Sequence, residues 1–162
     1  MPKQFDPHPK KNKALAIFIT GLIAGTLDIT AACIQYYSKT GKGPGNVLRY
    51  IASGVFGKDA GTGGNTMAAW GLLFHYLIAF GLTIFFFWLY PRVNWIRKNI
   101  IAAGVLYAIF AWAITTRVII PLSKIHPAPF DLSKVSIAVA ILIVCIGLPI
   151  ALLTANYYSR KV

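Results

Sequence analysis

The chain contains no glutamate, and its four acidic residues are all aspartates. Histidine and cysteine are scarce as well, with three and two copies in 162 residues. A metal site built from clustered His, Cys, Asp and Glu side chains therefore lacks material, and so does a disulfide framework. The sequence also has no Gly-x-Ser-x-Gly elbow and no phosphate-binding glycine fingerprint. We predict no metal, no cofactor and no set of catalytic residues.

Charge is sparse and one-sided. Charged residues make up 12% of the chain and hydrophobic residues 57%, against about 25% and about 45–50% in average soluble domains. The mean hydropathy of +0.64 suits lipid better than water. The net charge of +12 is carried largely by tails and loops beside apolar runs, where Lys and Arg meet anionic headgroups. We therefore expect membrane lipids, not nucleic acid, as the partners of these bases.

Four long apolar runs dominate what is present. They cover residues 14–37, 67–90, 99–122 and 133–158, and each reaches the about 20 residues that a helix needs to cross a bilayer. Helices are predicted because backbone groups in lipid must be satisfied within their own segment, and no β-barrel alternation is visible. Pro149 predicts a kink in the last run. The predicted fold is all-α: a polytopic, antiparallel four-transmembrane-helix bundle that forms a single domain over residues 1–162.

The distribution of Lys and Arg predicts the orientation, since short basic segments tend to stay in the cytoplasm. Bases are concentrated in the N-terminal tail, in the short loop after the second run and at the C-terminus. These three segments lie on one side of a four-span bundle, and the bases of the other side are spread over a longer loop. We predict a multi-pass protein of the inner (plasma) membrane with both termini in the cytoplasm.

The first outer loop contains an amphipathic segment, residues 46–57, that is too short to cross a membrane. Its apolar positions follow helical spacing on one face: Val47, Leu48, Ile51 and Val55. Polar residues follow the same spacing on the opposite face. The segment is predicted to be a short helix with Arg49 and Tyr50 at the interface. It either lies flat in the outer interface or caps the mouth of the bundle, and the two readings are compatible.

Small residues recur at helical spacing in the predicted spans. In the first span, one face carries Gly21, Gly25, Asp28, Ala32 and Gln35. Similar stripes contain Gly71, His75 and Ala79 in the second span, and Gly104, Ala108, Ala111 and Thr115 in the third. Such stripes let helices approach closely. They predict helix packing within the bundle, and they also offer faces for a protein partner or a homo-oligomer.

Asp28 is the residue least suited to its surroundings, because a carboxylate at that depth costs at least about 2.5–3.5 kcal/mol on insertion scales. It must face a partner, water or a ligand. His75 shares its depth and lies on a packing face, and Arg117 shares its depth but points away from its own small-residue stripe. We select Asp28, His75, Arg117 and Gln35 as candidate ligand or proton-site residues. Asp28 as a protonated packing residue and His75 as a hydrogen-bonded packing residue remain open alternatives.

Three stretches, GLIAGTLDITAA at 21–32, VLRYIASGVFG at 47–57 and GLLFH at 71–75, together resemble a family of small, uncharacterised bacterial inner-membrane proteins with four predicted spans. The resemblance covers most of the chain. It implies the fold and the membrane location but no activity. The matching stretches include Asp28, the amphipathic segment and His75, which makes this outer cluster a candidate site.

The sequence supports several functions. The first is a small bundle that accompanies a larger membrane assembly as accessory or scaffold, or that binds a lipid or a small polar molecule in an outward-facing cavity. The alternative is an oligomeric, proton-coupled transporter or channel that uses Asp28 and His75. An enzyme that acts on a lipid with these two side chains as acid and base is a third hypothesis, less favoured than a non-enzymatic role.

Overall fold

The computed structural model describes residues 3–7, 9, 12–125 and 131–161. Within these ranges the chain folds into four helical spans, each long and apolar enough to cross a membrane. In chain order they are α1 (Lys13–Thr40), α3 (Gly64–Leu89), a third span of α5 (Ile100–Ile114), η2 (Thr115–Ile119) and α6 (Ile120–Leu122), and a fourth of α7 (Leu132–Leu142), η3 (Ile143–Gly147) and α8 (Leu148–Tyr157). The chain is a multi-pass membrane protein with an all-α bundle fold, as predicted.

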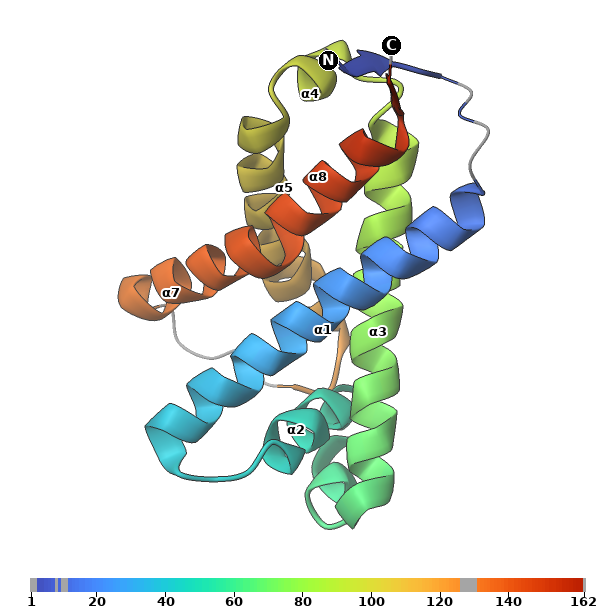
Figure 1. The fold of residues 1–162 in the computed structure, drawn as a ribbon. Coiled ribbons are helices and arrows are strands. Elements are labelled where there is room, and N and C mark those ends of the chain that lie inside the picture. The colour runs from blue at the N-terminus through green and yellow to red at the C-terminus, as the bar shows by residue number, and fades with distance from the viewer. Residues whose placement is uncertain (1–2, 8, 10–11, 126–130, 162) are drawn as a thin grey trace.

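The spans cross one another at a marked inclination (Figure 1). α1 and the rod formed by α7, η3 and α8 run diagonally across α3 and α5, and both termini lie at the same end of the bundle. α1 packs against α3 and α8, and α5 packs against the fourth span. Below, the end that holds both termini is called the terminal side. The opposite end, where α2 (Gly45–Phe56) and η1 (Gly57–Gly61) join α1 to α3, is called the α2 side.

A two-stranded antiparallel ladder ties the chain ends together on the terminal side. β1 (Lys3–Phe5) pairs with β2 (Ser159–Lys161), a feature that the sequence patterns did not predict. The Phe5 ring packs beside Tyr158 at a centroid distance of 6.1 Å, and the Arg97 guanidinium, from the short α4 (Asn94–Lys98), lies 4.3 Å from the Phe5 centroid. The ladder and this cation–π contact fix both chain ends to the bundle.

Large side chains fill the bundle on the terminal side. Phe86, Phe87 and Ile150 are fully buried. Tyr107 of α5 packs edge-on against Phe86 of α3 with ring centroids 4.8 Å apart, and its hydroxyl donates to the Leu82 carbonyl at 2.6 Å. α3 and α5 are therefore joined directly in this half of the bundle.

The predicted small-residue stripes are used for packing within the chain. A Cβ atom at Gly21 would collide with the Phe80 ring, and one at Gly25 would lie 2.9 Å from the Tyr76 ring, so α1 sits close on α3. A Cβ at Gly147 would collide with the Gly104 carbonyl of α5. Glycine permits these approaches because it has no side chain.

Both interior prolines follow a π-helical turn. Pro149 is the second residue after η3, and the Leu148 N–H donates to the Ile143 carbonyl five residues back. Pro121 comes after η2, in which the Ile120 N–H donates to the Thr115 carbonyl. A proline has no N–H to donate and its ring clashes with the carbonyl four residues earlier. The wider turn relieves that clash, so a π turn precedes Pro149 where a kink was predicted.

α2 lies against the part of α3 that is on the α2 side. Its Ala52 side chain is fully buried, and the Leu48 carbonyl approaches α3 so closely that a Cβ at Gly71 would collide with it. The Lys124 N–H donates to the Gly54 carbonyl at 2.8 Å, which joins α2 to the segment after α6. This packing agrees with the interpretation of residues 46–57 as a cap. Their position in a lipid interface stays a prediction.

Two glycines of α3 provide a matched test of this contact. Gly71→Ala is expected to lower the melting temperature in detergent, because the overpacking cost of about 1–3 kcal/mol exceeds the about 1 kcal/mol gained in helix propensity. Gly81→Ala is expected to keep or raise it, since no atom lies within 4 Å of a Cβ at that position. Equal effects of the two substitutions would contradict the close approach of α2 to α3.

Candidate functional site

A cavity of about 750 Å³ opens in the bundle on the α2 side. One wall of the cavity is formed by α3, and the opposite wall is formed by the end of α5 together with η2. Residues of α7 and η3 also line it, and α2 and the turn after α6 cover it. The cavity exists because α3 and α5, joined at Tyr107 on the terminal side, are not held together on this side. α1 contributes a single lining residue, Asp28.

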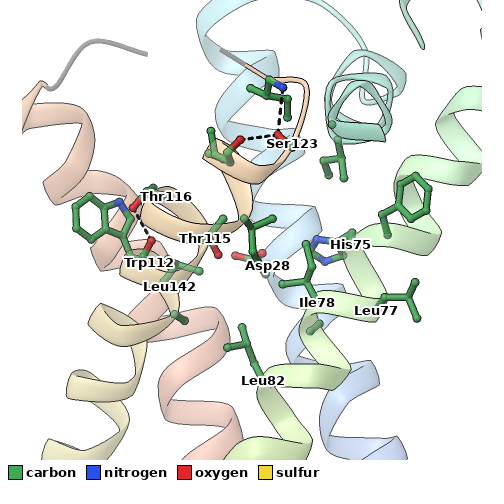
Figure 2. Close-up of a pocket in the computed structure, with 18 of the residues that line it drawn as sticks. Asp28, His75, Leu77, Ile78, Leu82, Trp112, Thr115, Thr116, Ser123 and Leu142 are labelled. Carbon is green, nitrogen blue, oxygen red and sulfur yellow. Dashed lines mark hydrogen bonds between the residues drawn. The ribbon is translucent and has the colours of Figure 1, made fainter. Parts of the chain in front are cut away.

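Asp28 and His75 point into this cavity from two different helices (Figure 2). They lie within electrostatic reach of each other. Neither an ion pair nor a direct hydrogen bond joins them, and the Asp28 carboxyl group makes no hydrogen bond with any residue in the described ranges. In the described ranges, an ion pair joins the Asp131 carboxylate to the Lys134 ammonium group at 3.2 Å, and neither residue lines the cavity. The carboxyl group of Asp28 is therefore left to whatever occupies the cavity.

The position of His75 follows from the close packing of α1 on α3. Its Nε2 lies 2.8 Å from the Gly25 carbonyl, one turn before Asp28 on α1. A carbonyl oxygen can only accept, so Nε2 carries a proton and donates it. A second bond, 2.7 Å between the Thr26 and Tyr76 hydroxyls, joins the same two turns. In the neutral imidazole the Nδ1 lone pair remains available as an acceptor.

The π turn η2 adds polar groups to the opposite wall. Thr115 and Thr116 both line the cavity. The Thr116 hydroxyl donates to the Trp112 carbonyl at 2.8 Å, whereas the Thr115 hydroxyl makes no hydrogen bond within the described part of the chain. In the turn after α6, the Ser123 hydroxyl donates to the Ile120 carbonyl at 2.7 Å. Thr115 is thus the hydroxyl of this wall that is left for a ligand or water.

The remaining surface of the cavity is apolar and aromatic. The aromatic lining residues come from α2, α3 and α5: Tyr50, Phe74 and Trp112. Aliphatic side chains such as Leu82, Leu142 and Ile146 cover the deeper wall. The result is an apolar chamber with a few polar groups near one another, which is the usual composition of a small-molecule site.

Two of the four candidate site residues meet at the cavity and two do not. Asp28 and His75 line it together. Arg117, on η2, is exposed and is not among the lining residues, so no pair with Asp28 forms. Gln35 is half-buried farther along α1, also away from the cavity. The exposure of Arg117 agrees with the expectation that its side chain points away from the small-residue stripe of the third span.

The two predicted interfacial residues lie on α2. Arg49 donates from Nη2 to the Asn46 Oδ1 at 2.7 Å and is not part of the cavity. Tyr50 is 55% exposed and also lines the cavity, so it belongs to the rim of the site.

Sequence patterns missed the contribution of the third span. Trp112, Thr116 and Ser123 were not selected, and Thr115 was assigned to a packing stripe. The available signal was Pro121, a proline inside an apolar run that predicts an irregular turn one turn earlier. In the described part of the chain, no group of three or more His, Cys, Asp or Glu side chains is arranged to hold a metal ion.

No protein-family model, no curated protein and no solved structure matches the chain. The function must therefore be inferred from the geometry of the cavity.

The hydrogen bond of His75 gives a direct test of this geometry. In nitrogen NMR spectra of the chain labelled at histidine, the neutral His75 ring is expected to be the Nε2–H tautomer, with its proton protected from exchange. Gly25 is the acceptor, so the resonance should shift when α1 and α3 are separated by Gly25→Leu, whose side chain would collide with Tyr76. An Nδ1–H tautomer would contradict the bond.

Proposed function

We propose that this protein binds an amphipathic molecule drawn from the membrane, a lipid or a small organic compound, in the cavity between α3 and α5. The observation that carries the proposal is the chamber of about 750 Å³ with the unpaired Asp28 carboxyl group and His75 at one end. Sites for small molecules typically measure about 300–1,000 Å³ and combine apolar walls with a few polar groups.

Polar and apolar groups are separated within the chamber. The acceptor groups of Asp28, His75 and Thr115 lie at the part of the cavity next to α1 and η2. The aliphatic side chains of Leu82 and Ile146 extend the lining toward the terminal side. A ligand with a polar head and an apolar body would satisfy both parts. A wholly polar molecule would leave the aliphatic wall facing polar groups, and a wholly apolar one would leave a carboxyl group without a partner.

Several lining residues are also exposed on the outside of the bundle, which supports access to the cavity from the surroundings. Leu77 of α3 is 60% exposed, Val55 of α2 is 51% exposed and Leu122 of α6 is 83% exposed. These residues come from both walls and from the cover. Apolar side chains at the mouth favour entry from lipid over entry from water.

Orientation and partners remain part of the proposal. The basic segments on the terminal side favour a cytoplasmic location for both termini in an inner membrane, with the cavity in the outer half. The small-residue faces proposed for a protein partner or homo-oligomer are occupied within the chain at Gly21, Gly25, Gly71 and Gly104. A partner would therefore bind another face, such as the open one around Gly81.

A proton-coupled transporter is the second candidate, favoured by the two π turns beside the cavity. Thr115 and Ile119 of η2 and Ile146 of η3 line it. π turns recur at functional sites, where they allow local rearrangement. Transport additionally requires that the Asp28 side chain reach both sides of the membrane in turn.

Filling the cavity tests the binding proposal. Ala138 lines the cavity from α7, and Ala140 is exposed on the same helix. We expect lipid or another small molecule to co-purify with the wild-type protein in native mass spectrometry. It should be lost from Ala138→Phe and retained by Ala140→Phe, because only the former side chain occupies ligand volume. Equal retention by the two folded variants, or no bound molecule in the wild type under gentle extraction, would overturn the proposal.

The orientation has its own test. A reporter that fluoresces only in the cytoplasm, fused to the C-terminus, is expected to be active, and a periplasm-dependent phosphatase fused there is expected to be inactive. Insertion of the same pair of reporters at Gly43, in the loop between α1 and α2, should give the reverse. Active phosphatase at the C-terminus would reverse the proposed topology.

A further inference from the structure

We infer that the ligand of this cavity is an organic cation, a bulky amine or other onium group attached to an apolar body. The inference rests on the proposed binding function and specifies its chemical class. It is carried by the charge inventory of the cavity together with its aromatic lining.

The charge inventory favours a positive ligand. Among the described residues that line the cavity, Asp28 is the one carboxylate, and no lysine or arginine is present. The other free polar groups are the Nδ1 atom of His75, whose Nε2 donates to the Gly25 carbonyl, and the Thr115 hydroxyl. A ligand that carries positive charge or N–H donors would form hydrogen bonds and a charge pair with these groups. An anionic head would meet like charge next to Asp28 in an apolar, poorly screened space.

The aromatic lining suits a cation whose charge is spread over carbon substituents. Trp112, Tyr50 and Phe74 line the cavity from three elements, and Figure 2 shows Trp112 beyond Thr115 as seen from Asp28. Aromatic faces attract ammonium groups within about 6 Å of the ring centroid, and quaternary ammonium ions are the groups that aromatic cages bind best. A hydrated inorganic ion would not use these walls, because it would lose its water for few oxygen ligands.

The size of the chamber agrees with a bulky ion. A volume of about 750 Å³ is far larger than a metal ion or a simple ammonium group requires, and the aliphatic wall of Leu82, Leu142 and Ile146 can hold the apolar body. Burying apolar substituents is favourable in proportion to the apolar area that is removed from water. This gain favours a large hydrophobic cation over a small polar amine.

Basic residues near the α2 side could favour an anionic ligand, but they lie outside the cavity. Arg49, Arg117 and Lys124 lie on or next to the α2 side, but none of them lines the cavity. Arg49 is bonded to Asn46. These bases can hold lipid phosphates at the surface. They are too peripheral to neutralise a negative group beside Asp28.

A pair of probes with the same shape and opposite charge tests the inference. Tetraphenylphosphonium and tetraphenylborate should be titrated against the full chain in phosphatidylcholine nanodiscs, with empty nanodiscs subtracted. We expect the wild-type protein to bind the phosphonium at least about tenfold more tightly than the borate, because the charge–charge term changes sign. Equal binding of both ions, or tighter binding of the borate, would overturn the inference without any variant being needed.

Two carboxamide substitutions then locate the site. Asp28→Asn removes the carboxylate of the cavity, and Asp59→Asn removes an exposed carboxylate of η1 outside it. The first should weaken phosphonium binding at least about tenfold, and the second should change it by less than about twofold. If Asp28→Asn does not fold, Trp112→Leu serves in its place and should weaken the phosphonium severalfold while leaving a neutral monoacylglycerol unaffected. An unchanged phosphonium affinity in the folded variant overturns the inference.

The monoacylglycerol also separates this inference from the proposed function. If the wild-type chain binds it, and Ala138→Phe abolishes that binding while the phosphonium does not bind, the cavity is a ligand site but its ligand is not a cation. If neither probe binds to the wild-type chain, both the inference and the proposed function fail.

Discussion

The arrangement of the bundle depends on the contact between α1 and α3 at Gly25. The absence of a side chain there lets the Tyr76 ring and the His75 imidazole reach the α1 backbone, and His75 donates to the Gly25 carbonyl at 2.8 Å. Asp28 is one helical turn away, so the same contact brings the carboxyl group and the imidazole into one space. A carboxyl group in a span that faced acyl chains would carry an insertion cost with nothing to offset it. The contact at Gly25 directs the Asp28 carboxyl group into the bundle instead.

The cavity itself has a different origin. Tyr107 joins α3 to α5 on the terminal side, while on the α2 side the third span passes into the π turn η2 before Pro121. The fourth span likewise contains η3 before Pro149, and its Gly147 packs against Gly104. The helices are thus tightly packed in the half of the bundle on the terminal side and separated in the half on the α2 side. α2, packed on Gly71, covers the space that results.

Much of this fold could be predicted from the sequence, because hydrocarbon-length apolar runs and helical spacing of small residues report local requirements. The spans, the short helix after the first span and the Gly21–Gly25 face are found where those patterns indicate. The site was predicted in part. Asp28 and His75 are conspicuous because their chemistry is misplaced in lipid, so each could be found singly. Trp112 and Thr115 could not be found in this way, because such side chains are common in apolar spans and line the site only through the opening between α3 and α5. The exposed position of Arg117 agrees with the direction that helical spacing indicated. The β1–β2 ladder was missed because three-residue strands leave no periodic pattern.

The side chain at position 28 faces a cavity that water or a ligand can enter, whereas that of Leu27, the residue before it on α1, faces the outside of the bundle. Thiol reactivity measures this most directly. Asp28→Cys and Leu27→Cys would be compared in a detergent-purified background in which Cys33 and Cys145 are replaced by alanine, since Leu27 is 44% exposed on the outer surface of the bundle. A maleimide reacts with the thiolate, which needs water to form. The cysteine at position 28 is expected to react, and the one at position 27 is expected not to react. An unreactive thiol at position 28 beside a reactive one at position 27 would contradict this placement.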